Sequence, residues 1–237
     1  NATTSITITA PQAITINANS TDATCFGEAS GTVNVSVSGG TGNYTYTWTG
    51  PNNFTSNNQN ISSVASGLYT LTVADQNNCT QTSNTFISEP APIQSTAITA
   101  NVTCASGNDG SINITPSGGS GNFTFAWSGP NGFSSSNQNL TGLVDGSYTC
   151  VVYGGNNCFD QVTVVLQSPQ VMSLDDVTTN VSCFGLSNGS VNLVPSDGTF
   201  PYTFLWSNTA TTEDIVNVIA GTYSVTVTDA VGCKISG

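Results

Sequence analysis

Cysteine is the residue type in this sequence with the clearest capacity for chemistry. The chain has seven cysteines in 237 residues and no histidine, so neither a Cys-His nor a Ser-His-Asp nucleophile can form. Six cysteines occupy two positions of a pattern that recurs about every 79 residues, and the seventh is Cys150. Cysteines placed by a repeat are typical of disulfides formed in an oxidising compartment.

The first and third repeats have two cysteines each, which suggests how the cysteines pair. We expect each pair to be bonded within its repeat, and internal homology extends this to the middle repeat. Such bonds close loops of about 50 residues and contribute roughly 4 kcal/mol in the chain-entropy model. A metal site is the alternative, but two cysteines per repeat are too few ligands without histidine. The predicted disulfides are Cys25–Cys79, Cys104–Cys158 and Cys183–Cys233.

Cys150 stands where the sister repeats have Leu71 and Val225, on the inward face of a predicted strand. This position predicts a buried free thiol that packs as a small hydrophobic residue. The Tyr148-x-Cys150 spacing is like that of immunoglobulin domains, but the earlier strand offers no partner cysteine.

The acidic residues do not suggest catalysis or a required cofactor. A glycosidase needs two carboxylates that face each other across a cleft, whereas Asp175 and Asp176 are adjacent and point apart on an extended backbone. Calcium at the junctions between repeats is an alternative role for this pair, although the first junction has Gln94 and Ser95 instead. We expect no enzymatic activity, no catalytic residue and no cofactor.

The charge balance excludes two classes of partner. The net charge is −12, with one lysine and no arginine, so no cationic surface exists to hold nucleic acid or an anionic membrane. No apolar run approaches the ~18 residues of a membrane-spanning helix, and we expect no direct membrane insertion.

Aromatic residues mark the repeat. The tryptophans are 79 residues apart, whereas the last interval between the tyrosines is four residues shorter, which places a deletion in a surface loop. Alternation within each strand favours core positions for all six residues over a platform for stacking sugars. They are Trp48, Trp127, Trp206, Tyr69, Tyr148 and Tyr223.

Period-two alternation dominates the remaining sequence. Val33, Val35 and Val37 alternate with polar residues, and turn residues recur every 8–12 positions. Nothing helical separates the strands, which argues against a parallel sheet. The pattern predicts an all-β fold: tandem Ig-like (PKD/fibronectin-like) antiparallel β-sandwiches in a linear array.

The repeat frame is offset from the fold. Residues 1–11 correspond to the closing strand of a preceding repeat, followed by sandwiches at 12–90, 91–169 and 170–237, of which the last lacks its closing strand. The simpler interpretation is a window on a longer array. The alternative is strand exchange, in which residues 1–10 complete the third sandwich of another copy.

Several motifs together resemble the SprB repeat. They are Cys-Phe-Gly at 25–27, Gly-Gly-Thr-Gly-Asn-Tyr-Thr-Tyr-Thr-Trp at 39–48, Gly-Leu-Tyr-Thr-Leu-Thr-Val-x-Asp at 67–75 and Asn-Cys at 78–79. The likeness spans essentially the whole chain in three copies and is clearest at 221–233, whereas the middle repeat lacks the usual Asp. Such repeats occur in very large cell-surface adhesins of Bacteroidetes, including those involved in gliding motility.

The resemblance implies a non-enzymatic adhesive stalk or filament on the bacterial surface, exported commonly by the type IX system. The expected partners are neighbouring repeats of the same chain or other copies. One alternative is an array of carbohydrate-binding modules that contacts surface polysaccharide. Another is a self-assembling filament subunit joined by strand exchange. The family supplies no catalytic residues to carry over.

Overall fold

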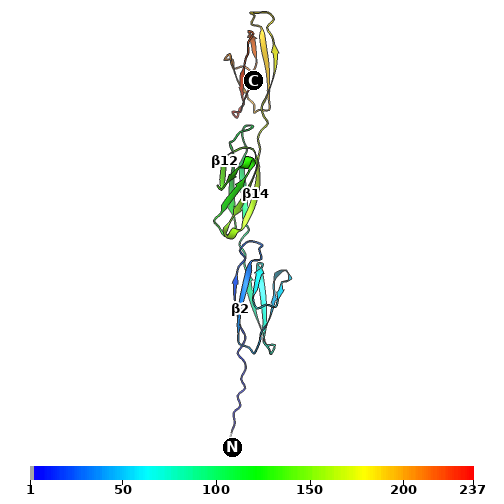
Figure 1. The fold of residues 1–237 in the computed structure, drawn as a ribbon, viewed down its shortest axis with the longest axis vertical. Helices are drawn as coiled ribbons and strands as arrows, with labels where there is room; N and C mark the ends of the chain where they lie inside the picture. Colours follow the sequence, from blue (N-terminus) through cyan, green and yellow to red (C-terminus); the bar gives the residue numbers. More distant parts are fainter. Residues whose placement is uncertain (1–2) are drawn as a thin grey trace. The chain divides into compact units, whose positions relative to one another are not determined.

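The computed structural model describes residues 3–237 and has an all-β architecture (Figure 1). We call β1–β7 repeat 1, β8–β14 repeat 2 and β15–β20 repeat 3. Repeat 1 comprises β1 (Thr15–Thr21), β2 (Gly31–Ser38), β3 (Thr45–Thr49), β4 (Thr55–Ser56), β5 (Ile61–Val64), β6 (Gly67–Ala74) and β7 (Thr80–Ile87), with a 3-10 turn at Pro51–Asn53. Repeat 2 comprises β8 (Gln94–Ala100), β9 (Gly110–Ser117), β10 (Thr124–Ser128), β11 (Ser134–Ser135), β12 (Asn139–Leu143), β13 (Gly146–Tyr153) and β14 (Phe159–Leu166), with 3-10 turns at Pro130–Gly132 and Gly155–Asn157. Repeat 3 comprises β15 (Ser173–Thr179), β16 (Gly189–Ser196), β17 (Thr203–Trp206), β18 (Ile215–Val218), β19 (Val225–Thr228) and β20 (Lys234–Ser236).

Each repeat folds into two antiparallel sheets, as the alternation predicted. In repeat 1 the strand orders are β1-β2-β5 and β4-β3-β6-β7, and repeat 2 reproduces them as β8-β9-β12 and β11-β10-β13-β14. Repeat 3 has the orders β15-β16-β18 and β17-β19-β20. The prediction of tandem Ig-like sandwiches is therefore confirmed.

The core of repeat 1 lies between its two sheets. The buried positions of β2 and β6 follow the period of two, since Val33 and Val35 alternate with exposed Asn34 and half-buried Thr32. Burying one valine or leucine side chain stabilises a fold by roughly 1.5–3 kcal/mol. The cluster comprises Val33, Val35, Trp48, Ile61, Val64, Tyr69, Leu71, Val73 and Ile87.

The recurring tryptophan and tyrosine combine burial with a satisfied polar group. The Trp48 indole N–H donates to the Asn58 carbonyl oxygen at 2.9 Å, and the Tyr69 hydroxyl donates to the Ala65 carbonyl oxygen at 3.0 Å. The same two bonds recur in repeats 2 and 3. A tyrosine that bonds backbone a few residues upstream is the tyrosine corner of Ig-like sandwiches.

The last strand of a complete repeat packs tightly over β2 or its equivalent. A Cβ on Gly31 would lie 2.7 Å from the Ile87 methyl, and a Cβ on Gly110 would lie 2.9 Å from a Leu166 methyl. Glycine at these positions allows this close approach, because an added Cβ would also meet the Val64 or Leu143 carbonyl oxygen at 2.9 Å.

The chain divides into two compact units. One comprises Asn1–Gln94, Pro116–Thr124 and Val152–Asp160, and the other comprises Ser95–Thr115, Phe125–Val151 and Gln161–Gly237. The junction of repeats 1 and 2 lies within the first unit, and that of repeats 2 and 3 within the second. Residues 3–13 adopt no strand, and the first two residues of the closing strand predicted at 1–11 lie outside the described part of the chain.

Candidate functional site: the disulfide-bridged junctions

Both disulfides of the structure join one repeat to the next. Cys25 of repeat 1 is bonded to Cys158 of repeat 2, and Cys104 of repeat 2 is bonded to Cys233 of repeat 3, each with a Cα–Cα distance of 5.5 Å. The prediction of disulfides within each repeat is therefore wrong. In place of Cys25–Cys79, Cys104–Cys158 and Cys183–Cys233, the structure leaves Cys79 and Cys183 free and exposed among residues 3–237.

Strand geometry explains the error. Cys79 immediately precedes β7, whereas the backbone of Ser88, just after β7, is bonded to Ala23 and Asp22 beside Cys25. An eight-residue strand spans about 27 Å, and a disulfide requires Cα atoms roughly 4.4–6.8 Å apart. The two cysteines of one repeat lie at opposite ends of its sandwich, so the bonds that form are Cys25–Cys158 and Cys104–Cys233, each between adjoining repeats.

The loop that carries the first cysteine is built in the same way in all three repeats. The residue before the cysteine donates its backbone N–H to a side-chain oxygen six residues further on, and the carbonyl of the cysteine accepts a turn bond. The three side-chain bonds are Thr24 N to Ser30 Oγ (2.8 Å), Thr103 N to Asp109 Oδ1 (3.0 Å) and Ser182 N to Asn188 Oδ1 (3.1 Å). The three turn bonds are Glu28 N to Cys25 O, Gly107 N to Cys104 O and Leu186 N to Cys183 O.

The turn that carries the second cysteine is held by a buried aspartate in repeats 1 and 3. Asp75 accepts the backbone N–H groups of Thr41, Asn77 and Cys79, each at 2.9 Å. Asp229 accepts those of Thr199, Val231 and Cys233 at 2.8–3.0 Å.

These hydrogen bonds lower the pKa of both carboxyl groups. Burial raises the pKa of Asp75, but the N–H groups of Cys79, Thr41 and Asn77 outweigh it, and the resulting pKa lies below the ordinary value. The N–H of Thr199 is the largest influence on Asp229 and lowers its pKa against the opposing effect of burial. Both carboxylates are therefore engaged in shaping a turn, a structural role rather than acid–base chemistry.

The linker at the first junction is bonded on both sides. The Glu89 carboxylate accepts the Gly27 N–H at 2.6 Å from the Cys25 loop, and the Ala91 carbonyl accepts the Gly119 N–H at 2.9 Å from repeat 2. Pro90 and Pro92 each fix a φ angle. Together with the disulfide, these contacts limit bending at the junction.

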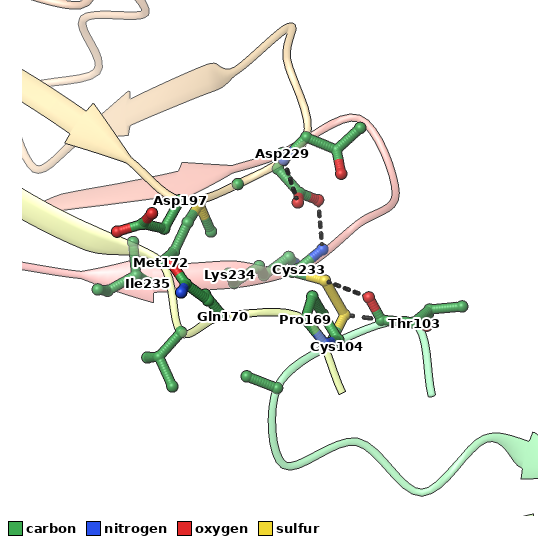
Figure 2. A pocket seen from close by; sticks show the side chains of 14 residues that line it. Thr103, Cys104, Pro169, Gln170, Met172, Asp197, Asp229, Cys233, Lys234 and Ile235 are labelled. Carbon is green, nitrogen blue, oxygen red and sulfur yellow. Dashed lines mark hydrogen bonds between the residues drawn. A yellow bond between two sulfur atoms is a disulfide. The ribbon is translucent and has the colours of Figure 1, made fainter. Parts of the chain in front are cut away.

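The second junction has a small, partly open pocket of about 130 Å³ beside the Cys104–Cys233 bond (Figure 2). Figure 2 shows the disulfide between Cys104 and Cys233, with Thr103 and the linker residue Pro169 next to it. Met172 and Gly198 line the pocket on the side of repeat 3. Asp229 holds the turn through the backbone N–H groups of Val231 and Cys233, and the disulfide bonds this turn to Cys104 of repeat 2. We call this covalent connection a clamp.

The remaining predicted residues lie in the cores. Trp48, Trp127 and Trp206 are buried, as are Tyr69 and Tyr148, whereas Tyr223 is partly exposed. These positions leave the three tryptophans unable to stack on a sugar. Cys150 is fully buried and unpaired among the described residues, and burial raises the pKa of its thiol to about 11.

Between residues 3 and 237, no three His, Cys, Asp or Glu side chains converge to ligate a metal ion. Nor does this stretch contain a helix with the length and apolar character needed to span a bilayer.

Solved structures with similar folds are immunoglobulin-domain proteins. The N-terminal eight Ig domains of Down Syndrome Cell Adhesion Molecule isoform 1.30.30 are 12% identical with a TM-score of 0.39, covering 86% of this chain and 33% of that one. Sidekick-1 immunoglobulin domains 1–5 are 12% identical with a TM-score of 0.34, covering 97% and 58%. This chain thus spans about a third of the length of the first structure. A search of curated proteins finds no match.

The paired sheets and clamped junctions define this protein as a chain of tandem Ig-like domains. The model of the SprB repeat matches residues 17–53, 96–132 and 176–211. The chain therefore contains three SprB repeats, an adhesin-type repeat, and the resemblance predicted from the motifs is confirmed. Each matched segment includes the first cysteine and the tryptophan of its repeat and ends before the second cysteine.

The disulfide partners of Cys25, Cys104, Cys158 and Cys233 were not predicted from the sequence. A regular recurrence of two cysteines in every repeat is compatible with bonds within a repeat and with bonds between repeats. The signal that could have separated these cases was the predicted strand between Cys79 and Glu89, because it places the second cysteine a full strand length from the end of its own repeat.

Proposed function

We propose that this protein is a non-enzymatic, load-bearing segment of an extracellular adhesin, displayed on the bacterial surface as a stalk or filament. The observation that carries the proposal is that both disulfides connect successive repeats. Disulfides persist outside the cytoplasm, which supports an extracellular location. The SprB repeats support the adhesive class and make export by the type IX system the route to examine.

The connectivity supports a mechanical role. The two rings overlap, since Cys104 and Cys158 each lie inside the ring closed by the other disulfide. The shortest covalent path between the chain ends runs through residues 1–25, crosses to Cys158, returns to Cys104 and crosses to Cys233. This path uses about a third of the backbone, so unfolding under load releases little length.

Single-molecule stretching of the chain from end to end tests the load-bearing role. At about 3.5 Å per residue, the reduced chain should extend to roughly 800 Å and the oxidised chain to roughly 300 Å. Cys25→Ser should give an intermediate extension of roughly 400 Å. The matched control Cys150→Ser removes a thiol outside both disulfides and should leave the oxidised extension unchanged. Equal extensions of oxidised and reduced chains would overturn the load-bearing role.

Location and adhesion require a separate measurement. An antibody against the repeats should label intact, unpermeabilised cells that produce the native protein. The 237-residue chain should be inert on a glycan array. Strong binding to a defined polysaccharide would replace the stalk with a carbohydrate-binding module array.

A further inference from the structure

The first junction has an open recess lined by exposed aromatic side chains. The recess has a volume of about 340 Å³ and borders the Cys25–Cys158 bond. Phe26 and Phe159, each next in sequence to a bonded cysteine, line it and are 57% and 65% exposed. The Tyr153 ring lies against Phe159, with ring centroids 6.1 Å apart. Large apolar side chains that gather on a surface mark a place where a partner binds.

The linker gives the recess a rigid apolar lining within one compact unit of the chain. Pro90, Pro92 and Ile93 supply this part of the lining. Each proline fixes a φ angle, and the Ala91 carbonyl between them accepts the Gly119 N–H at 2.9 Å. A lining that is already ordered loses little conformational entropy when a ligand binds, which favours affinity.

The Glu28 carboxylate is the charged group in the lining, and Asn157 adds an uncharged amide. One oxygen of Glu28 accepts the Thr24 hydroxyl at 2.8 Å, and this bond holds the carboxylate beside the recess. A carboxylate has about four acceptor positions, so Glu28 can still accept hydrogen bonds from a ligand. The recess therefore offers aromatic faces and a negatively charged acceptor to the same occupant.

The second junction shows that closure of a junction does not require these groups. It has a disulfide between the corresponding cysteines and the same linker proline, Pro169. Its pocket is smaller, at about 130 Å³. Because this disulfide forms without them, the two phenylalanines and the glutamate of the first junction are not explained by the structure of the junction. The residues that replace Phe26, Glu28 and Phe159 there are Ala105, Gly107 and Lys234.

The surroundings of the recess favour a cation. Asp22 and Glu89 add two carboxylates at the first junction, each bonded to a backbone N–H. The corresponding residues of the second junction are uncharged, namely Asn101 and Ser168. The chain has a single basic residue, Lys234 of repeat 3, and a net charge of −12. Charges of one sign raise the local concentration of a partner with the opposite charge.

We propose that the recess of the first junction binds an arginine side chain on a basic segment of a partner protein. A guanidinium group is planar and weakly hydrated, so it stacks on the rings of Phe26 and Phe159 and donates hydrogen bonds to the Glu28 carboxylate. Its aliphatic stem lies against the linker prolines. A lysine ammonium is compact and strongly hydrated, and it fits this combination less well.

The inference rests on the proposed adhesive class, because it names the chemistry of what the adhesin holds. The two can fail separately. Binding of a basic peptide depends on the lining of one recess, whereas the stretching experiment measures the covalent path through both disulfides.

The test measures binding of a fluorescent peptide, in which arginine alternates with glycine, to the full oxidised chain by fluorescence anisotropy at physiological salt. Two matched pairs of variants separate the recess from the general negative charge and from exposed aromatic surface. Glu28→Gln is compared with Glu213→Gln, which removes the same charge from an exposed loop of repeat 3. Phe26→Ala is compared with Phe86→Ala, which removes a 63% exposed ring from β7.

The arginine peptide should bind the wild-type chain, and a peptide with lysine in place of arginine should bind about threefold more weakly or worse. Glu28→Gln and Phe26→Ala should each raise the Kd about threefold or more, and Phe26→Ala with Phe159→Ala about tenfold. Glu213→Gln and Phe86→Ala should change the Kd less than about twofold. Peptide mapping under non-reducing conditions should show the Cys25–Cys158 bond intact in every variant.

Three results would overturn the assignment. The first is no binding of the arginine peptide to the wild-type chain. The second is an equal loss within either matched pair, which would assign the affinity to diffuse charge or to any exposed ring. The third is equal affinity for the arginine and lysine peptides.

Discussion

Repeats 1 and 3 share motifs, turns and core positions but differ at one sheet edge. In repeat 1, β7 covers the end of the core, and Val33 and Tyr69 are fully buried. In repeat 3, the equivalent Val191 and Tyr223 are only partly buried and line an open groove. The difference shows that the closing strand, and not the shared motifs, determines how much of the core is excluded from water.

The comparison also separates two kinds of stabilisation. Repeat 1 has a complete hydrophobic core in addition to its clamp to repeat 2. Repeat 3 has a smaller cluster, in which Leu193, Trp206, Ile215, Val225 and Val227 are buried, and a disulfide to repeat 2. Substitutions in repeats 1 and 3 can test whether the larger core makes repeat 1 the more stable of the two.

The largest effect should follow loss of the disulfides. Each encloses more than 125 residues (sequence separations of 133 and 129) and contributes about 5 kcal/mol in the chain-entropy model. Cys104→Ser with Cys233→Ser should make repeat 3 the first to unfold, whereas Cys25→Ser with Cys158→Ser should leave repeat 1 folded. Hydrogen exchange measured by mass spectrometry reports the repeats separately. Equal loss of protection in both repeats would remove the contrast.

Shortening the buried side chain at the end of β7 should weaken the core of repeat 1 and make it more like that of repeat 3. Ile87 is buried beside Gly31, so Ile87→Ala should lower the free energy of unfolding of repeat 1 by about 3 kcal/mol. Urea denaturation measures this change. The control is Phe86→Ala, since Phe86 is exposed on the same strand and its loss should cost less than about 0.5 kcal/mol.

Val33 and Val191 occupy equivalent positions in repeats 1 and 3. Alanine substitutions at these two positions therefore measure how much the closing strand contributes to the stability of the core. Val33→Ala should destabilise repeat 1 by about 2 kcal/mol, and Val191→Ala should destabilise repeat 3 by less than about 1 kcal/mol, since Val191 already contacts solvent. Denaturation midpoints of the two variants give the comparison. Similar losses would show that the groove is closed in solution.

The smallest effect should be a pH dependence of the cysteine turns. The pKa values of Asp75 and Asp229 lie below the ordinary value of 3.8 in the folded state. Their stabilising contribution is therefore fully present above about pH 3.8 and is lost as the pH falls through the lowered folded pKa. Asp75→Asn should lower the free energy of unfolding of repeat 1 at neutral pH. This difference in stability between variant and wild type should shrink as the pH falls below about 3.8.

Acid titration of stability, followed by circular dichroism, measures the effect. Asp176→Asn, at an exposed position of β15, is the control and should show little change. If the Asp75→Asn difference persisted at the lowest pH, the carboxylate would not be its source.

Much of the fold could be predicted because it depends on local patterns. The alternation at Val33 and Val35 selects strands, and the recurrence of Trp48 and Tyr69 selects core positions, since both are properties of residues near one another in sequence. The SprB motifs are equally local. Cys150 could be placed on an inward face for the same reason.

The sequence by itself thus determined the all-β class, the three repeats and the positions of their core residues. Only the tertiary structure decided that Cys25 bonds Cys158 and that Cys104 bonds Cys233. The physical reason is that a strand about 27 Å long separates the two cysteines of a repeat, and the chain folds so that each repeat ends against the next. A periodic sequence specifies each unit equally, whereas the contacts between units depend on which ends meet in space.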